Sequence, residues 1–235
     1  MQNTIILVAE IAACFTAVLL FFKLFGKSGL IAWIAIASVL ANIITAKTSN
    51  ILGLDAAQGT VIFASTFLAT DILCERYGKR EATTGVLIGL CSSIVLIGAT
   101  QIALLYTPVD YDFADEPMRV LFTLNLRISA ASILMYAVAN LADIFVFERL
   151  RKATKGRHLW LRNNVATITC NCIENFGFIF LAFIGVYDAR TCFEIAIATS
   201  IIEIVTSVCD TPFVYIGRKL RPLRGEIASQ SITTG

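Results

Sequence analysis

Residues 65–80 read STFLATDILCERYGKR. This stretch is apolar enough for a membrane-spanning helix, yet it carries two carboxylates, Asp71 and Glu75, four residues apart. Side chains at this spacing share one face of an α-helix. The stretch then ends in the basic run RYGKR. We predict that the face with the carboxylates looks into a polar protein interior, and that the basic run marks where the helix meets the cytoplasm.

The composition of the whole chain predicts a membrane protein. Of its 235 residues, 57% are hydrophobic and 15% are charged, whereas soluble domains carry about 25% charged residues. Apolar runs of about 20 residues, the length that crosses a bilayer, recur along the chain. These properties predict an all-α, polytopic membrane helix bundle without a separate soluble domain. The seven predicted spans are 4–22, 30–47, 57–75, 83–106, 121–147, 164–186 and 191–216.

The basic residues predict how the bundle is oriented, because cytoplasmic loops are enriched in Lys and Arg. If the seven spans alternate in direction, 15 of the 19 Lys and Arg residues lie on one side, and the acidic loop PVDYDFADEP (108–117) lies on the other. The N-terminus is therefore expected outside and the C-terminus inside. We expect an extra N-terminal helix with a basic loop (1–29), a six-helix core (30–224) and a polar cytoplasmic tail (225–235).

The chain carries no motif of a known enzyme class. No Walker loop, GxSxG or HExxH is present. The seven cysteines include no CxxC pair, and Cys170 and Cys172 project to opposite sides of a helix, so they are poor joint metal ligands. An intramembrane enzyme built on Asp71 and Glu75 is a rival reading, but no nucleophile or metal set accompanies these residues. We predict no catalytic residue, no metal and no cofactor.

Polar residues within the spans define a candidate site. A charged side chain at mid-membrane costs at least about 2.5 kcal/mol on insertion scales, so each one needs a partner or a function. Four polar residues recur at steps of four, four and three and form one stripe along the sixth span: Asn163, Thr167, Asn171 and Glu174. Interhelical hydrogen bonds account for Thr167 and Asn163, but the Glu174 carboxylate needs a cation, a proton or a ligand. Arg127 is expected either to pair with a carboxylate or to orient a substrate.

Two spacing patterns concern the packing of the spans. Asp71, Asp143 and Asp210 each precede a basic run near the inner end of an inward-running span. At 1.5 Å per residue, all three should lie roughly 10–12 Å from the basic edge. Gly85 and Gly89 form a GxxxG pattern, which is typical of close helix packing.

Five segments of the chain are characteristic of one protein family, unlike the general patterns above: ANIITAKTSNILG (41–53), TFLATDILCERYGKREA (66–82), NLADIFVFERL (140–150), LWLRNNVATITCNCIEN (159–175) and DTPFVYIGRK (210–219). Together they resemble the queuosine precursor transporter family, also called the vitamin uptake transporter family. The resemblance extends in order from the second to the seventh span. The sequence FLATDIL followed by ExYG is its most specific part.

The resemblance implies a membrane transporter that imports 7-deazaguanine precursors of the tRNA nucleoside queuosine, namely preQ0, preQ1 or queuine. The implied location is the cytoplasmic membrane, and the implied partners are a small deazapurine base and the lipid bilayer, with no nucleic acid. The preferred base, the coupling ion and homo-oligomer formation stay open. The alternative function is a substrate-binding membrane component, for a vitamin-like ligand, that needs a separate ATPase module.

The chemistry of the ligand, together with the resemblance, suggests site residues. A deazaguanine presents N1–H and 2-amino donors that one carboxylate can accept together, and an O6 acceptor suited to an Asn amide. We predict that Glu174 and Asn171 read the base and that aromatic residues in the 176–180 region stack on its ring. The predicted substrate-binding residues are Asn42, Asp71, Arg127, Asp143, Thr167, Asn171 and Glu174. The predicted coupling residues are Glu75, Glu203 and Asp210.

Overall fold

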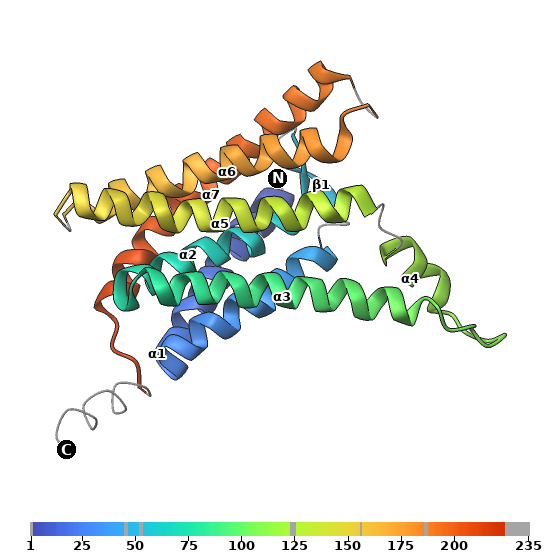
Figure 1. Cartoon of the computed structure of the whole chain (residues 1–235), viewed down its shortest axis with the longest axis horizontal. Coiled ribbons are helices and arrows are strands. Elements are labelled where there is room, and N and C mark those ends of the chain that lie inside the picture. The colour runs from blue at the N-terminus through green and yellow to red at the C-terminus, as the bar shows by residue number, and fades with distance from the viewer. Residues whose placement is uncertain are drawn as a thin grey trace.

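The computed structural model describes residues 2–44, 47–51, 54–122, 126–155, 157–185 and 188–223. The chain folds into a bundle of long helices with a short β-hairpin at its edge (Figure 1). In chain order the elements are α1 (Gln2–Ile44), β1 (Thr48–Ile51), β2 (Leu54–Ala57), α2 (Thr60–Tyr77), α3 (Lys79–Ala103), α4 (Asp115–Phe122), α5 (Leu126–Ala153), α6 (Leu159–Phe183) and α7 (Ala189–Lys219). The predicted helix bundle is confirmed. The antiparallel hairpin, which pairs Thr48 with Ala57, is an addition that the all-α prediction lacked.

Five helices of the described chain are long and apolar enough to cross a membrane: α1, α3, α5 from Ala131 onward, α6 and α7. The 43 residues of α1 suffice for two crossings at 1.5 Å per residue. The 18 residues of α2 include three charged side chains, those of Asp71, Glu75 and Arg76, and this helix is not among the five. The chain is therefore a multi-pass helical membrane protein, while its seven-span count and its orientation stay predictions.

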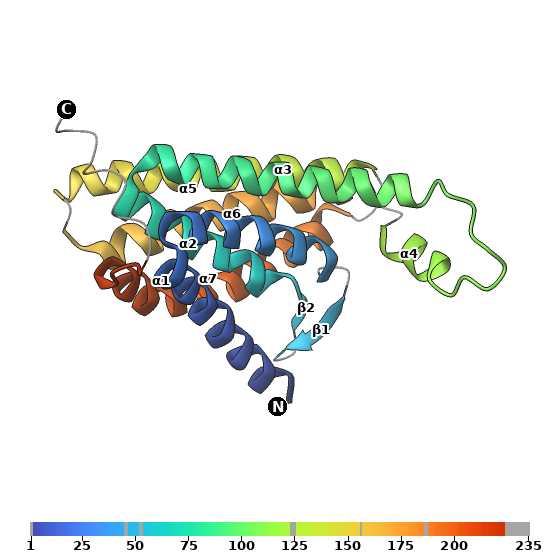
Figure 2. The same cartoon turned by 90° about the horizontal axis from the view of Figure 1, so that it is seen from below.

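Helix α1 bends sharply at Gly26, where the backbone leaves helical geometry with φ 61° and ψ −138° (Figure 2). Glycine adopts a positive φ at little cost, unlike residues with a Cβ. A second glycine is required nearby, because a Cβ on Gly29 would collide with the carbonyl oxygen of Phe21. The loop predicted between the first two spans is thus a kink within one helix.

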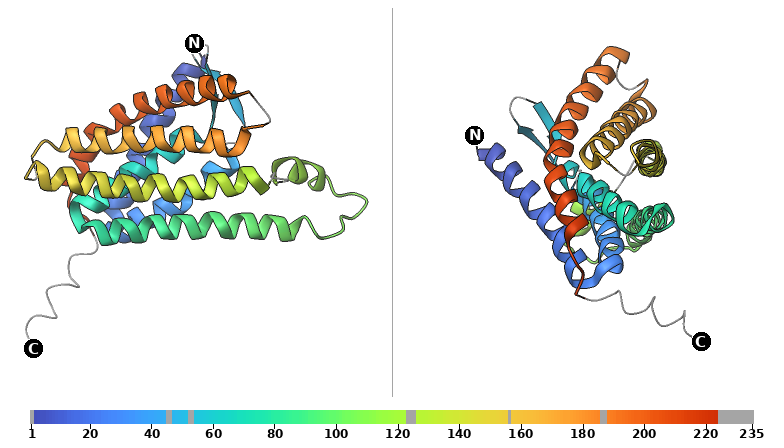
Figure 3. Two further views of the ribbon diagram at one scale, coloured as in Figure 1. Left: turned by 45° about the horizontal axis from the view of Figure 1, so that its top comes forward. Right: turned by 90° about the vertical axis from the view of Figure 1, so that its left-hand side faces the viewer.

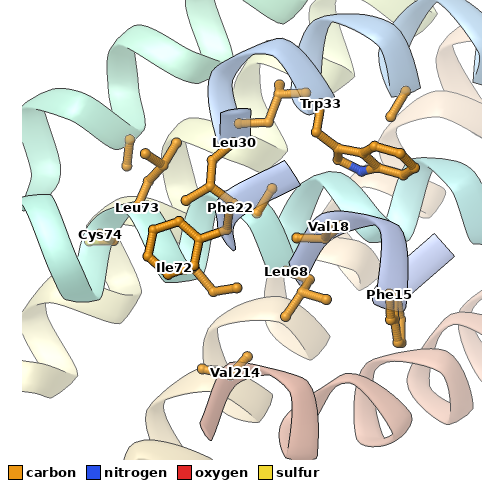
Figure 4. Packing of buried hydrophobic residues seen from close by; sticks show 14 of the residues in the cluster. Phe15, Val18, Phe22, Leu30, Trp33, Leu68, Ile72, Leu73, Cys74 and Val214 are labelled. Atoms are coloured by element: carbon orange, nitrogen blue, oxygen red, sulfur yellow. The ribbon is translucent and has the colours of Figure 1, made fainter. Parts of the chain in front are cut away.

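The two halves of α1 both contribute to the main apolar core. Figure 4 shows Phe15, Val18 and Phe22 from the first half packed near Leu68 of α2 and Val214 of α7. These three residues of α1 are fully buried. The predicted boundary at residue 29 therefore divides a packed unit, and a chain beginning there would expose apolar surface that α1 now covers.

The basic segments gather at one end of the bundle. The α2–α3 and α5–α6 junctions and the C-terminal end of α7 lie together there, while the acidic loop 108–117 lies at the opposite end (Figure 1; Figure 3, left). Lys27 of α1 pairs with Glu81 of α3 at 3.1 Å. Arg76 donates a hydrogen bond to the carbonyl oxygen of Arg218 at 2.9 Å. This separation of charge agrees with the pattern from which the orientation was predicted.

The GxxxG pattern of α3 marks a close helix contact, as predicted. A Cβ on Gly85 would lie 2.9 Å from Ile34 of α1. A Cβ on Gly89 would collide with the hydroxyl group of Tyr136 from α5 and lie 2.9 Å from Ser38 of α1. The Tyr136 and Ser38 hydroxyls are themselves hydrogen-bonded at 3.0 Å. The absence of a side chain at residue 89 therefore lets α1, α3 and α5 meet.

We predict that Gly89→Ala destabilises the folded protein by about 1–3 kcal/mol, because the added methyl group overpacks this contact. Gly98→Ala on the same helix is the matched control, since a Cβ there meets no atom within 4 Å and alanine favours a helix. The check is the Tm of both purified variants in one detergent. Equal Tm values would contradict the packing role of Gly89.

Candidate functional site: a polar seam between helices

The predicted polar stripe of α6 lies in the protein interior. Asn163, Thr167 and Asn171 are at most 1% exposed. Glu174 is half-buried one turn further along, and Asn175 beside it is buried. The stripe therefore faces other helices rather than lipid.

A second polar stripe runs along α7, which packs against α6. Its members recur at steps of three, four and three, and all are buried: Ser200, Glu203, Ser207 and Asp210. The two acidic members are predicted coupling residues, whereas the two serines were not predicted from the sequence. The helical spacing of all four was the signal that could have found them. We call the two stripes, together with Asp71 and Asp143 beside them, the polar seam.

Three aspartates meet in the part of the seam nearer the basic end. Asp143 of α5 accepts a hydrogen bond from the Thr167 hydroxyl at 3.3 Å and shares one with Asp71 of α2. Asp210 of α7 accepts a hydrogen bond from the Asn163 amide at 2.7 Å. Because a hydrogen bond between two carboxyl groups requires a proton on one of them, Asp71 and Asp143 share a proton. The three aspartates, which were expected to lie at the same distance from the basic edge, are thus close together.

Two glutamates occupy the part of the seam further from the basic end. The Asn175 amide donates to Glu203 at 2.7 Å and lies 3.4 Å from the Ser200 hydroxyl. Glu174 lies close enough to Glu203 for the two charges to interact. Further along the same two helices is an aromatic cluster, in which the rings of Phe176 and Phe193 meet edge to face, with centroids 5.4 Å apart. Buried carboxylates suit a ligand that carries hydrogen-bond donors.

The seam has more acceptors than the described residues satisfy. Several of its buried oxygen atoms have no hydrogen-bond partner among these residues, including those of Asn163, Asn171, Glu174 and Ser207. An unsatisfied buried polar atom costs about 1–3 kcal/mol. Such atoms indicate a place for water or a ligand. Within the described part of the chain, no group of three or more His, Cys, Asp or Glu side chains is arranged to hold a metal ion.

Three predicted residues are not brought into the seam by the described structure. Asn42 donates to the Ser38 carbonyl oxygen at 2.7 Å and to the Ser93 hydroxyl at 3.1 Å, so it links α1 to α3. Glu75 lies at the basic end, as described next. The side chain of Arg127 lies outside the described part of the chain, as does the predicted tail 225–235, so their predicted roles stay predictions.

Glu75 is held by arginines from two helices. Its carboxylate lies 3.3 Å from Arg218 of α7 and 4.0 Å from Arg151 of α5. A hollow of about 440 Å³ opens there, lined by Glu75, Arg76, Tyr77 and Arg218. These ion pairs tie three helices together at the basic end. Glu75 is thus paired with arginines, whereas the seam carboxylates Asp210 and Glu203 accept hydrogen bonds from neutral amides. The predicted coupling role of Glu75 stays a prediction.

Comparisons with known proteins identify similar chains. A family described as "Putative vitamin uptake transporter" matches residues 57–217, which include α2 to α6 and most of α7. A "Probable queuosine precursor transporter" of Bacillus subtilis (strain 168) is 34% identical over 209 residues, covering 88% of this chain and 91% of that protein. A "Queuosine precursor transporter" of Escherichia coli (strain K12) is 30% identical over 137 residues, covering 57% of this chain and 58% of that protein. No solved structure matches the chain.

We predict that Asn163→Leu lowers the free energy of unfolding by about 1–3 kcal/mol, because it removes the amide donor from the buried Asp210 carboxyl group. Asn164→Leu is the neighbouring control. Its amide donates to the Thr211 hydroxyl at 2.6 Å and to the Trp160 carbonyl oxygen at 2.8 Å. Both acceptors are neutral and more exposed than Asp210, so we expect a smaller loss of about 0.5–1.5 kcal/mol. Unfolding of both variants in detergent gives the comparison, and a larger loss for Asn164→Leu would contradict it.

Proposed function

Because the chain belongs to the vitamin uptake transporter family, it is a transporter rather than an enzyme, and we propose that it imports 7-deazaguanine precursors of queuosine through the cytoplasmic membrane. The names of the two relatives support this class of substrate. The observation that carries the proposal is the polar seam. A buried row of acceptors with unsatisfied oxygen atoms suits a small ligand rich in donors.

Within the seam, we assign recognition of the base to Glu174 and Asn171. Glu174 Oε2 and Asn171 Oδ1 are buried, and no described residue forms a hydrogen bond with either atom. The two residues lie three positions apart, so they share one face of α6. A carboxylate at this point can accept the N1–H and 2-amino donors together, and the Asn171 amide can donate to O6. Phe178, four positions after Glu174 and on the same face of α6, supplies a ring for stacking.

The remaining predicted residues are proposed to support the site. Asp71, Asp143 and Thr167 form the hydrogen-bonded group nearer the basic end, and we propose that they shape the binding site. Asp210 and Glu75 stay candidates for coupling. The proposed roles of Asn42 and Arg127 rest on the family resemblance.

The proposed topology places the basic end in the cytoplasm. The two halves of α1 then form the first two of seven spans, and α2 crosses the membrane between α1, α7, α3 and α5, which separate its charged side chains from lipid. Residues 30–224 would form the transporter core. The match of residues 57–217 to the family supports a site that lies beyond the first half of α1.

Restoration of queuosine in tRNA tests the proposed function. In a host that can neither make nor import the precursors, we expect expression of this chain to restore queuosine when preQ0, preQ1 or queuine is supplied. Each base is given in turn, at a concentration that does not restore queuosine without the chain. Failure with every base, despite membrane insertion of the chain, would contradict the proposal. Uptake by vesicles that contain only the purified chain tests whether a separate ATPase module is needed.

We predict that Glu174→Gln lowers the affinity for deazaguanines by roughly 10- to 150-fold, the equivalent of about 1.5–3 kcal/mol, because an amide donor replaces one acceptor. The control is Glu194→Gln. Glu194 is exposed on α7 and pairs with Arg190 at 2.9 Å, so this change should leave affinity unaltered. Affinity is measured on the folded fraction of each variant. Unchanged affinity of Glu174→Gln for every base would remove Glu174 from the site.

A further inference from the structure

Glu174 and Glu203 form a carboxylate pair on two facing helices. Asn175, which follows Glu174 on α6, donates a hydrogen bond to Glu203 of α7 at 2.7 Å, so the two glutamates lie at the same level of the contact between these helices. Among the described residues, Glu174 Oε2 has no hydrogen-bond partner. Two negative charges at one helix contact repel each other in an interior of low dielectric constant. Positive charge beside either member therefore stabilises the pair.

The described side chains do not supply that charge. None of the ion pairs that the structure shows among them joins a Lys or Arg to Glu174 or Glu203. Neutral polar side chains lie beside the pair, among them Asn175 and Ser200. The Asn171 side chain is 1% exposed, and its Oδ1 atom has no hydrogen-bond partner among the described residues. The described part of the site thus suits a cationic ligand.

We propose that the Glu174–Glu203 pair selects ligands that carry a primary ammonium group in addition to the donors of a guanine-like ring. Glu174 accepts the ring donors, and Glu203 binds the ammonium group. This inference rests on the proposed function and deepens it. It also gives Glu203, which the sequence analysis assigned to coupling, a role in specificity.

The chemistry of the deazaguanines fits two carboxylates on opposite helices. The substituent at ring carbon 7 leaves the base on the side away from the N1–H and 2-amino donors. In preQ1 this substituent is an aminomethyl group, which is protonated at neutral pH, as the amine of Lys is. In preQ0 it is an uncharged nitrile without a donor. A ligand without the ammonium group leaves the buried Glu203 carboxylate with the Asn175 amide as its described donor. Sites built to bind a substrate N–H discriminate strongly against analogues that lack it.

Binding of preQ1 and preQ0 to the purified full chain at neutral pH tests the inference. We expect the unaltered protein to bind preQ1 at least about tenfold more tightly than preQ0, the effect of one charge-assisted hydrogen bond. Glu203→Gln should weaken preQ1 binding by about the same factor and leave preQ0 binding within about threefold. Glu203→Asp keeps the charge and should retain most of the preference. Glu194→Gln, on the exposed face of the same helix, should behave as the unaltered protein.

The outcomes separate this inference from the proposed function. Equal affinity of the unaltered protein for preQ1 and preQ0 overturns the inference and leaves the proposed function standing. The inference is also overturned if Glu203→Gln loses affinity for preQ1 and preQ0 by the same factor, because Glu203 then affects binding of the ring and not of the ammonium group alone. If neither these bases nor queuine binds, the proposed function itself is wrong. Even if Glu203→Gln does not fold, the affinities of the unaltered protein for preQ1 and preQ0 still test the inference.

Discussion

The need to keep carboxylates away from lipid determines how the helices of this protein are arranged. Asp71, Asp143, Asp210 and Glu203 are at most 6% exposed. An ionisable group at mid-membrane is costly unless it faces the protein interior and finds a partner. Helix α2, which carries Asp71, is accordingly surrounded by α1, α3, α5 and α7. The more apolar helices can then present their outer faces to the bilayer.

The buried carboxylates of the protein have two kinds of partner, charged arginines and neutral hydrogen-bond donors. At the basic end, Glu75 is paired with Arg151 and Arg218, which neutralise its charge and join three helices. Within the seam, the partners are neutral donors such as Asn163 and Asn175. A neutral donor orients a carboxyl group without cancelling its charge, so the group keeps its capacity to bind a proton or a cation. This difference separates a structural ion-pair cluster from a place where a ligand can bind.

The parts of this structure that depend on helical periodicity could be predicted from the sequence. The stripe of α6, the matching depth of the three aspartates and the close contact at Gly89 all follow from spacing within single segments. The kink at Gly26 was missed because a glycine between basic residues also fits a loop. The links of Asn42 to Ser93 and of Ser38 to Tyr136 join residues 51 and 98 positions apart. Such contacts depend on how the helices pack, which the spacing within one segment does not reveal.

The most direct test of the account asks whether a deazaguanine occupies the space between α6 and α7. Ser200 is buried one turn from Glu203 on α7, and Ser200→Cys places a thiol there with little change of shape. In a chain without its native cysteines, the rate at which N-ethylmaleimide modifies this thiol is measured with and without a saturating concentration of ligand. Cys209, exposed on another face of the same helix, is restored alone in the control. We expect the ligand to slow modification at residue 200 and not at residue 209. Equal rates at residue 200 with and without bound ligand would contradict the placement of the site in the seam.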